Sequence, residues 1–588
     1  MSKVIVLATP VFFLLIAIEY AWGIAKGRNT YRLQDMVSSI GLGMMSQFTA
    51  VFTRLLRVGV YTAVYASLSL VPLDAAKEFW NTWTGWVLAL IFYDFCYYWL
   101  HRMGHESAIL WAAHVVHHQS QDYNLSTALR QTSSGALLGW VFYIPMALAG
   151  VPPAVFGIVA LIDLLYQFWV HTEHVPKLGW FDRWFCSPSN HRVHHAVNDR
   201  YVDRNYGGIL IIWDRMFGSF KEEDEKCVYG TRSPLKSWDP LWANAEVYAA
   251  LCKDAWHARS WLDKLRVFFK PPGWRPDDVA ARFPKPAFDM ESMRSKYQAQ
   301  SSFAANVFGV VSFNLLLGGV AAFLWLADDM AQDLQIVSVA TLCAMLWLTN
   351  AVLQARLHPW LGAAGWAAAI ATASACIAQA AGVSVAADVW LIIHRIFKPL
   401  GVGFALIFIA LHAYSMTANG IKSSKNLDKN LLLVALAFSV AGDAWLMFSG
   451  FFIQGLASFL VAHLFYIALF KQGVNWFPSK PILAACLAYG AAMYGYLLPN
   501  LSAGLQIPVA VYVFFIALMG AQAIGRALAL RTTSSKWVAV GSLLFMASDS
   551  LLAINKFVAS IPLSPLWILG AYFAAQILIT NNKVDTVM

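Results

Sequence analysis

Long apolar runs recur along this chain and constrain its fold more than any other feature. A helix needs about 20 consecutive apolar residues to cross a bilayer, and the sequence supplies roughly a dozen such runs. With 59% hydrophobic residues and a mean hydropathy of +0.55, the chain is too apolar for a water-soluble globule. We therefore expect an all-α polytopic membrane protein, with helices predicted at 4–25, 37–71, 83–100, 136–170, 303–326, 334–354, 361–381, 394–416, 431–449, 451–470, 481–498, 507–528, 537–556 and 563–581.

Charge and cysteine content exclude two other classes of protein. The net charge of +9 is explained by basic residues that hold cytoplasmic loops in place. Nucleic-acid binding is disfavoured, because no basic stripe interleaved with aromatic residues lies outside a membrane segment. The seven cysteines are scattered without a CxxC pair, which indicates reduced thiols in packing roles and no disulfide framework. The first run carries Glu19 and no A-x-A-like cleavage site, so we expect a retained helix and no signal peptide.

Histidines are concentrated between His101 and His195. Ten of the fifteen lie in that stretch, in the boxes HRMGH, HVVHH and NHRVHH and in HTEH at 171–174. A spacing of i, i+3 and i+4 places the rings of one box on one helix face. Structural zinc takes four ligands and catalytic zinc usually three, so this many imidazoles without matching cysteines indicate two metal ions, with iron favoured. A single such histidine could be structural, but three boxes together favour ligation.

The helix at 83–100 connects the first box to the membrane. Because this helix is expected to end directly on His101, it delivers the box to the membrane surface. Asp94 lies seven residues earlier, on the expected same face. A carboxylate inside a membrane is costly unless it is paired, so Asp94 is predicted to partner a ligating histidine. The alternative is a carboxylate near the interface that simply reaches water.

The composition changes twice after the boxes. Residues 171–302 are polar and aromatic and are predicted to form a cytoplasmic cap followed by a linker, in which five prolines between Pro271 and Pro286 preclude a long helix. From Phe303 the chain is apolar again, but carboxylates now lie inside apolar segments, at Asp443 and Asp549. This change suggests two fused catalytic units.

The boxes carry a resemblance to a known family. HRMGHE, HVVHHQSQDYNLSTALRQ, QFWVHTE and SPSNHRVHHAVNDRYVDRNYGGILIIWDRMFGSF resemble the fatty acid hydroxylase and sterol desaturase superfamily, and within it the alkylglycerol monooxygenases, over about residues 1–360. The resemblance implies that Glu106 is needed for activity. It also implies a diiron centre held by His101, His105, His114, His117, His118, His171, His191, His194 and His195. His174 departs from the pattern, and a supporting or surface role is favoured for it; His257 lies outside every box and is expected to be an ordinary exposed histidine.

The same resemblance implies a reaction and its cofactors. Two iron ions and O2 would hydroxylate the carbon next to an ether oxygen, and the resulting hemiacetal would collapse to a fatty aldehyde and a free glycerol hydroxyl. A tetrahydropterin or another electron donor, including a redox partner protein, would supply electrons. The implied partners are ether glycerolipid substrates and membrane lipid.

The second half resembles the lysoplasmalogenase (YhhN-like) family from about residue 361. The matching pieces are FKPL at 397–400, GDAWLMF at 442–448, FLVAHLFYIALF at 459–470, Arg526 and GSLLFMASD at 541–549. Vinyl ether hydrolysis protonates a carbon–carbon double bond and lets water capture an oxocarbenium ion, which requires one acid and one carboxylate. Asp443 and Asp549 are the candidates, and Lys398, His463 and Arg526 could bind a lysophospholipid head group. These polar groups could alternatively hold helices together.

The leading hypothesis is therefore a bifunctional ether-lipid enzyme, with a histidine-box oxygenase domain at 1–360 and a second membrane bundle at 361–588. One alternative makes the first half a sterol or fatty-acyl hydroxylase or desaturase. Another makes the second half a non-catalytic scaffold or a transporter. The boxes are expected to face the cytoplasm, because positive charge accumulates in residues 171–300.

Overall fold

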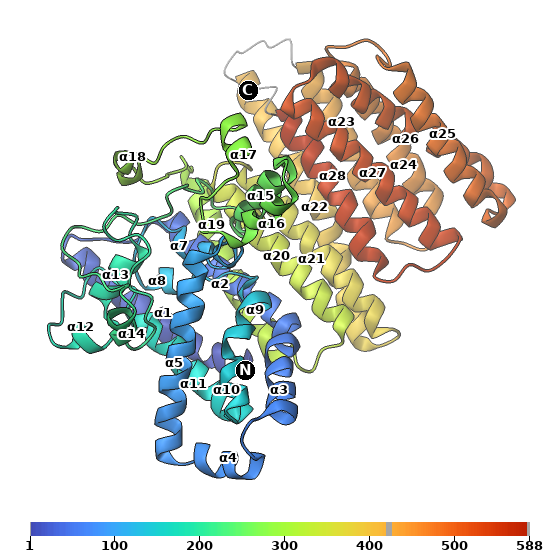
Figure 1. Cartoon of the computed structure of the whole chain (residues 1–588). Helices are drawn as coiled ribbons and strands as arrows, with labels where there is room; N and C mark the ends of the chain where they lie inside the picture. Colours follow the sequence, from blue (N-terminus) through green and yellow to red (C-terminus); the bar gives the residue numbers. More distant parts are fainter. Residues whose placement is uncertain (1, 419–425, 585–588) are drawn as a thin grey trace. The chain divides into compact units, whose positions relative to one another are not determined.

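The computed structural model describes residues 2–418 and 426–584, and within them nearly all regular structure is helical (Figure 1). The described residues form no extended strand, only two isolated β-bridges, Phe185 with Leu210 and Ala196 with Tyr229. Eleven described helices are long and apolar enough to cross a membrane: α1, α2 and α19 to α27. The expected all-α class is confirmed, and the chain is an integral multi-pass membrane protein.

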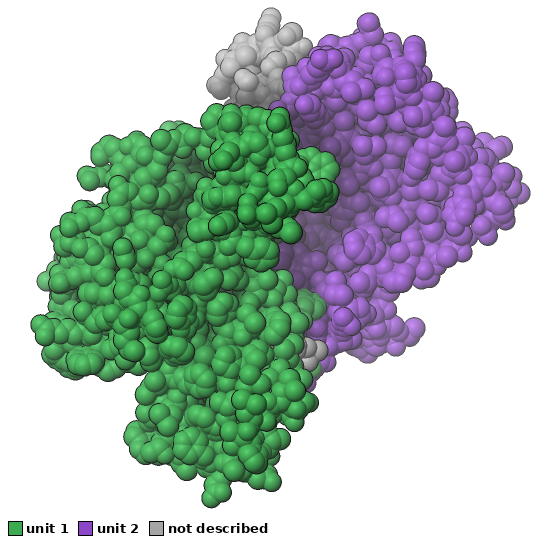
Figure 2. Space-filling view, viewed as in Figure 1, with its two compact units in different colours: residues 1–301, 313–328 green, residues 302–312, 329–588 purple. Residues whose placement is uncertain are grey.

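The described residues divide into two units (Figure 2). The first comprises residues 1–301 and 313–328, and the second comprises 302–312 and 329–588, so α19 (Phe303–Leu326) contributes to both. The domain boundary expected at 360/361 falls in the second unit, in the first turn of α21 (Pro359–Ala381), which follows α20 (Gln332–Leu353), and it stays a prediction.

Helices of the first unit follow the apolar runs, but those in the runs predicted at 83–100 and 136–170 are not among the eleven candidate membrane spans. The run at 37–71 is divided by a π-helical turn, and the run at 136–170 is broken between Ala149 and Pro152, as its two prolines predict. The elements are α1 (Ser2–Ala25), α2 (Leu33–Arg54), η1 (Leu55–Gly59), α3 (Val60–Leu68), α4 (Leu73–Trp80), α5 (Trp83–Glu106), α6 (Ala108–Ala112), α7 (Val115–His118), α8 (Leu125–Ala128), α9 (Gly135–Leu138), η2 (Gly139–Tyr143), α10 (Ile144–Leu148) and α11 (Pro153–Trp169).

Helix α5 differs from its prediction at the C-terminal end. It begins where the Thr82 side chain accepts a hydrogen bond from the Gly85 amide at 3.0 Å. It then continues through His101 and His105 to Glu106 instead of ending on His101. At 3.6 residues per turn, the continuation places both histidines of the first box on one helix face.

Residues 171–301 form short helices joined by loops. The proline-rich tract contains only α17 and α18, of six and five residues, so the predicted absence of a long helix is confirmed. The elements are α12 (Phe181–Trp184), α13 (Pro188–His195), α14 (Ile212–Met216), α15 (Pro240–His257), α16 (Trp261–Phe269), α17 (Asp277–Arg282) and α18 (Met290–Arg294). The cytoplasmic location of this segment stays a prediction.

The second unit is a bundle of long helices. Sequence neighbours pack in pairs, α21 against α22, α23 against α24, α25 against α26 and α27 against α28. The remaining elements are α22 (Val385–Ala418), α23 (Asn426–Leu446), α24 (Phe452–Lys471), α25 (Lys480–Leu497), η3 (Leu498–Asn500), α26 (Ala503–Leu530), α27 (Thr533–Phe557) and α28 (Ser564–Val584). The run predicted at 563–581 forms α28, which is not among the eleven candidate membrane spans.

Candidate metal centre and carboxylate cavity

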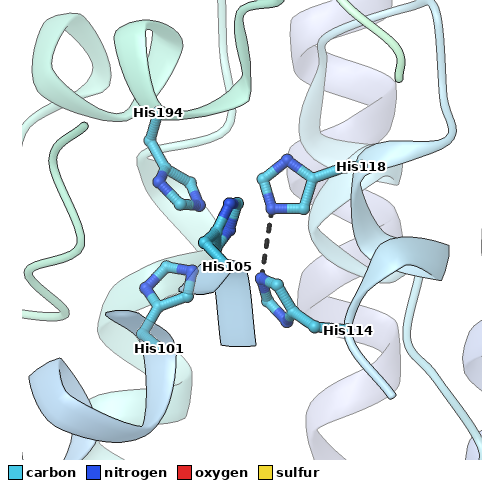
Figure 3. Close-up of side chains that lie close together, drawn as sticks. All are labelled: His101, His105, His114, His118 and His194. Carbon is cyan, nitrogen blue, oxygen red and sulfur yellow. Dashed lines mark hydrogen bonds between the residues drawn. The ribbon is translucent and has the colours of Figure 1, made fainter. Parts of the chain in front are cut away.

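Five histidines converge in the first unit, and we call them the five-histidine cluster (Figure 3). One ring nitrogen from each lies within 4.8 Å of one from every other. Helix α5 supplies two rings, α7 and the residue before it supply two, and α13 supplies one. The members are His101, His105, His114, His118 and His194.

Four further histidines form a second group, the four-histidine cluster. Its ring nitrogens also lie within 4.8 Å of one another, and all four residues are buried. The members are His117, His171, His191 and His195. The two clusters together contain the nine residues that the resemblance implies as ligands. Their ligation of metal stays a prediction.

Two short helices contribute to both clusters. In α7, His117 belongs to the four-histidine cluster while the adjacent His118 belongs to the five-histidine cluster, and His195 and His194 divide in the same way in α13. Adjacent helical residues project about 100° apart, which lets neighbours reach two different centres. The rings of His118 and His195 stack with centroids 4.3 Å apart, so the two clusters are in direct contact.

Backbone carbonyls orient several of these rings. In each case Nδ1–H donates to a carbonyl oxygen, which fixes the tautomer and leaves the Nε2 lone pair for another partner. The Nδ1 to oxygen pairs are His101 with Tyr206 at 2.8 Å, His117 with Arg130 at 2.9 Å, His171 with Gln167 at 2.8 Å and His194 with Arg204 at 3.0 Å.

The free Nε2 atoms fit a bound cation. Nε2 of His117 and Nε2 of His171 are 3.2 Å apart, although each ring already donates through Nδ1. Two lone pairs at this distance repel each other unless a cation lies between them. The Nε2 atoms of His101, His105 and His194 are buried and have no hydrogen-bond partner in the described part of the chain, a costly arrangement that metal ligation would relieve.

Burial also keeps eight of these imidazoles neutral. It lowers the pKa of His117 to about 4. Burial, with neighbouring histidines adding to its effect, likewise holds the pKa well below the ordinary value for His101, His114, His118, His171, His191, His194 and His195. Neutral imidazole is the form that ligates metal. Any ion bound here would therefore not compete with protons near neutral pH.

Asp94 has a different role from the predicted one. Its carboxylate accepts hydrogen bonds from the amides of Ile209 at 2.7 Å and Leu210 at 3.1 Å, and from the indole of Trp213 at 2.8 Å. It therefore holds the loop that follows Tyr206, whose carbonyl orients His101, and does not bind a histidine itself. A Cβ atom at Gly208 would lie 2.9 Å from Asp94 Oδ1, so glycine permits the close approach.

Arg130 is a supporting residue that sequence reasoning missed. Its side chain is fully buried and its Nε donates to the carbonyl of Val116 at 2.7 Å, while its own carbonyl accepts from His117. It thereby fixes α7 from two directions. The sequence signal is weak: a lone arginine in the polar stretch after the second box.

The other predicted residues of the first half lie outside both clusters. Glu106 pairs with Arg102 at 2.8 Å on the outer side of α5, and its side chain is 42% exposed. His174 is half-buried, and its Nε2 lies 3.2 Å from where a Cβ of Gly23 would be. His257 is half-buried and not exposed as expected, because its ring packs at a tilt against that of Phe283, with centroids 4.6 Å apart.

The second unit contains a cavity of about 360 Å³ lined by both predicted aspartates. Asp443 comes from α23 and Asp549 from α27, and Lys398 of α22 also lines the space. Much of the remaining lining is apolar, with Phe452, Phe459, Leu456 and Ile516 among its members. An apolar cavity with a few convergent polar groups is typical of a small-molecule site.

The two carboxylates have different partners. Asp443 accepts a hydrogen bond from the Tyr572 hydroxyl at 2.6 Å and lies 3.5 Å from the Lys398 ammonium. Asp549 accepts from the Tyr512 hydroxyl at 2.5 Å. Asp443 therefore has a lysine as its partner, whereas Asp549 has a tyrosine hydroxyl and, with its Nε2 3.9 Å away, the ring of His463.

His463 and Arg526 do not line the cavity. His463 is completely buried behind Tyr512, with its Nε2 2.9 Å from the Tyr512 hydroxyl oxygen. Arg526 donates to the carbonyl of Gln472, beyond the end of α24. The roles of both residues as head-group ligands stay untested.

Comparison with known proteins separates the two halves. A family model described as fatty acid hydroxylase matches residues 86–219, and one described as the YhhN family matches residues 393–582. No solved structure matches the chain.

Named relatives show the same division. The chain is 38% identical over 313 residues to an alkylglycerol monooxygenase from Homo sapiens, covering 53% of this chain and 68% of that protein. It is 41% identical over 271 residues to one from Danio rerio, covering 46% and 59%. It is also 34% identical over 161 residues to the lysoplasmalogenase TMEM86A from Bos taurus, covering 26% of this chain and 65% of that protein. The chain belongs to the alkylglycerol monooxygenase branch of the fatty acid hydroxylase family, and a segment behind it matches the YhhN family model.

Proposed function

We propose that the chain is a bifunctional ether-lipid enzyme. The first unit cleaves the alkyl ether of alkylglycerols in an iron-dependent oxygenation, and the YhhN segment hydrolyses the vinyl ether of lysoplasmalogens. Both reactions release a fatty aldehyde. The observation that carries the proposal is the assembly of nine histidines into two adjacent clusters, in a chain similar to alkylglycerol monooxygenases.

At the first site the two clusters would each hold one iron ion. Iron supplies the dioxygen chemistry that inserts an oxygen atom into an unactivated C–H bond. The protein holds the ligands in one tautomer through carbonyls such as that of Tyr206, and the buried rings exclude water from the centre. Hydroxylation next to the ether oxygen gives a hemiacetal, which breaks into aldehyde and alcohol.

Monooxygenation of this kind needs a source of electrons. Inserting one oxygen atom of O2 and reducing the other to water consumes two electrons and two protons. A tetrahydropterin or a redox partner protein would supply them. Measuring whether the purified chain needs a tetrahydropterin or a redox partner protein for turnover identifies the electron donor.

At the second site we assign Asp549 as the acid and Asp443 as the carboxylate. The Lys398 ammonium favours the ionised form of Asp443, whereas Asp549 has the Tyr512 hydroxyl beside it and the His463 ring at 3.9 Å. Asp549 would give its proton to the vinyl carbon, and Asp443 would stabilise the oxocarbenium ion and accept a proton from the attacking water. The hemiacetal then collapses, and proton return to Asp549 closes the cycle.

The test uses the purified full-length chain with four substrates: an alkylglycerol, a lysoplasmalogen, a sterol and a fatty-acyl lipid. We expect O2-dependent aldehyde release from the first and O2-independent release from the second. Turnover of the sterol or fatty-acyl lipid without the alkylglycerol would contradict the first assignment. Failure to cleave the lysoplasmalogen would leave the second unit as scaffold or transporter.

We also propose that the histidine boxes face the cytoplasm. The support is the accumulation of basic residues in 171–300 and the location of cellular reductants on that side. We expect a cysteine placed at Glu222, which is exposed, to react with an impermeant maleimide only after the cell membrane is opened. Reaction in intact cells would reverse the topology.

A further inference from the structure

Helix α15 turns an apolar stripe away from the protein. Its exposed residues include Trp242, Ala245, Ala249, Cys252 and Trp256, a spacing of i, i+3, i+7, i+10 and i+14 that lies on one face. The Trp256 side chain is 81% exposed. Yet α15 is not among the helices that are apolar enough to cross a membrane.

The opposite face of α15 packs on the protein and is mixed in character. Ala243 is buried in an apolar cluster with Leu42 and Val116, and Asp254 is buried in an ion pair with Arg275 at 2.7 Å. A helix that borders water carries polar residues on its exposed face. The tryptophans on the exposed face of α15 therefore indicate that something other than water covers that face.

Helix α16 extends this surface. Its exposed residues Trp261, Leu262, Leu265 and Phe269 occupy one side of the helix, and Trp261 is 82% exposed. The ammonium of Lys264 donates to the carbonyls of Ala255 and Trp256, at 2.9 and 3.1 Å, and so ties the two helices together. We call residues 240–270 the α15–α16 hairpin.

Cations accompany the exposed aromatic residues. Lys253, Arg259, Arg266 and Lys270 are exposed on the hairpin, and Asp263, which pairs with Arg266, is half-buried. Tryptophan beside lysine and arginine is typical of the membrane interface, where indoles lie at headgroup depth and cations meet anionic lipid. A protein partner of matching shape would not require this combination.

We propose that the α15–α16 hairpin lies in the plane of the bilayer surface, with its tryptophans among the headgroups and its cations on anionic lipid. The segment is thus a membrane-contacting element and not a cap surrounded by water. The hairpin also packs on α6, and the Ala108 amide donates to the Lys270 carbonyl at 2.9 Å. Trp111 of α6 contacts His105, with ring centroids 4.9 Å apart. One short helix therefore separates the proposed lipid contact from the five-histidine cluster.

The native thiol of Cys252 provides the test. Of the seven cysteines, it is exposed, five are buried and Cys343 is intermediate. The full-length C343S protein, labelled at Cys252 with a bimane maleimide, is reconstituted in phosphatidylcholine vesicles with and without phosphatidylglycerol. We expect quenching by headgroup spin-labelled lipid and little quenching by aqueous iodide. A matched protein, C252S/C343S with Glu222→Cys, should show the opposite pattern.

Two double substitutions sharpen the result. Trp256→Ser with Trp261→Ser should increase iodide quenching at Cys252, because both indole anchors are lost. Lys253→Glu with Arg259→Glu should reduce lipid quenching in the anionic vesicles and change it much less in the neutral ones. Iodide quenching at Cys252 equal to that at position 222 would overturn the proposal. Protection from iodide without lipid quenching would also overturn it, since a second copy or another protein would then cover the face.

Discussion

His118 and His194 lie opposite one another in the five-histidine cluster and offer a direct test of metal binding. Replacing either with alanine removes one ligand, so we expect iron content to fall and alkyl-ether cleavage to be lost while the membrane fold survives. Iron per chain is measured by mass spectrometry alongside aldehyde release. The matched control is His174→Ala, because His174 belongs to neither cluster. Full oxygenase activity in His118→Ala would refute the ligand assignment.

Asp549 and Tyr512 test the second site at the same scale. Asp549→Asn keeps the shape but removes the acid, so lysoplasmalogen hydrolysis should fall by about 10² to 10⁴. Tyr512→Phe removes a hydrogen bond to the carboxylate and should reduce the rate by about tenfold. Aldehyde release under anaerobic conditions measures both.

Tyr489→Phe is the control for Tyr512→Phe. Tyr489 also lines the cavity, but its hydroxyl contacts Ser550 and no carboxylate. We expect the Tyr489→Phe variant to hydrolyse the vinyl ether at a rate close to that of the unaltered chain. Equal losses in the two phenylalanine variants would show that Tyr512 matters only for packing.

Asp94 tests how a loop supports the metal centre, at the scale of elements. Asn at this position offers one acceptor oxygen to three donors and turns an amide N–H₂ toward them, so the loop at 206–213 should loosen. His101 would then lose its carbonyl partner, and we expect iron affinity to fall by about 10- to 100-fold. Loss of iron to a graded chelator series measures the effect.

Asp199→Asn provides the comparison for Asp94→Asn. Asp199 is an exposed carboxylate of the same unit that pairs with Arg232. Its replacement should leave iron retention unchanged. If Asp94→Asn retains iron equally well, the loop does not contribute to the site.

The sequence predicted the existence of most helices but not where some of them end. The apolar run stops near Leu100 because histidines follow, yet α5 continues to Glu106 since its rings are buried against other elements. The sequence also placed the nine histidines in boxes without dividing them between clusters. The division between clusters depends on two features: His114 precedes α7, and α13 is oriented so that His194 and His195 point to different clusters. Tertiary packing determines both features.

Iron removal tests the independence of the two sites at the scale of the whole molecule. The clusters use residues before position 200, whereas both aspartates lie after position 440 and line a cavity of the second unit. Chelation should therefore abolish alkyl-ether cleavage and leave vinyl-ether hydrolysis intact. Restoring iron should recover the first activity alone. Loss of both activities on chelation would contradict independent sites.

Sequence reasoning could name Asp443 and Asp549 but could not place them in one cavity. They are 106 positions apart, on α23 and α27, and their meeting depends on how the bundle packs. The same dependence explains Arg526 and His463, which the same family resemblance singles out yet which do not line that space. The sequence also did not reveal that the α15–α16 hairpin exposes apolar residues. These residues are too few for a membrane span, and which of them are exposed depends on how the hairpin packs on the protein.

The division of adjacent histidines in α7 and α13 has a consequence for how the centre fills. An ion in either cluster must order the same two short helices that the other cluster uses. Ordering these helices costs conformational entropy, which weakens binding of the first ion. The second ion binds to helices that are already ordered and therefore binds more tightly. Iron uptake should therefore be cooperative: at half saturation, most chains would hold two ions or none, and native mass spectrometry would find few with one.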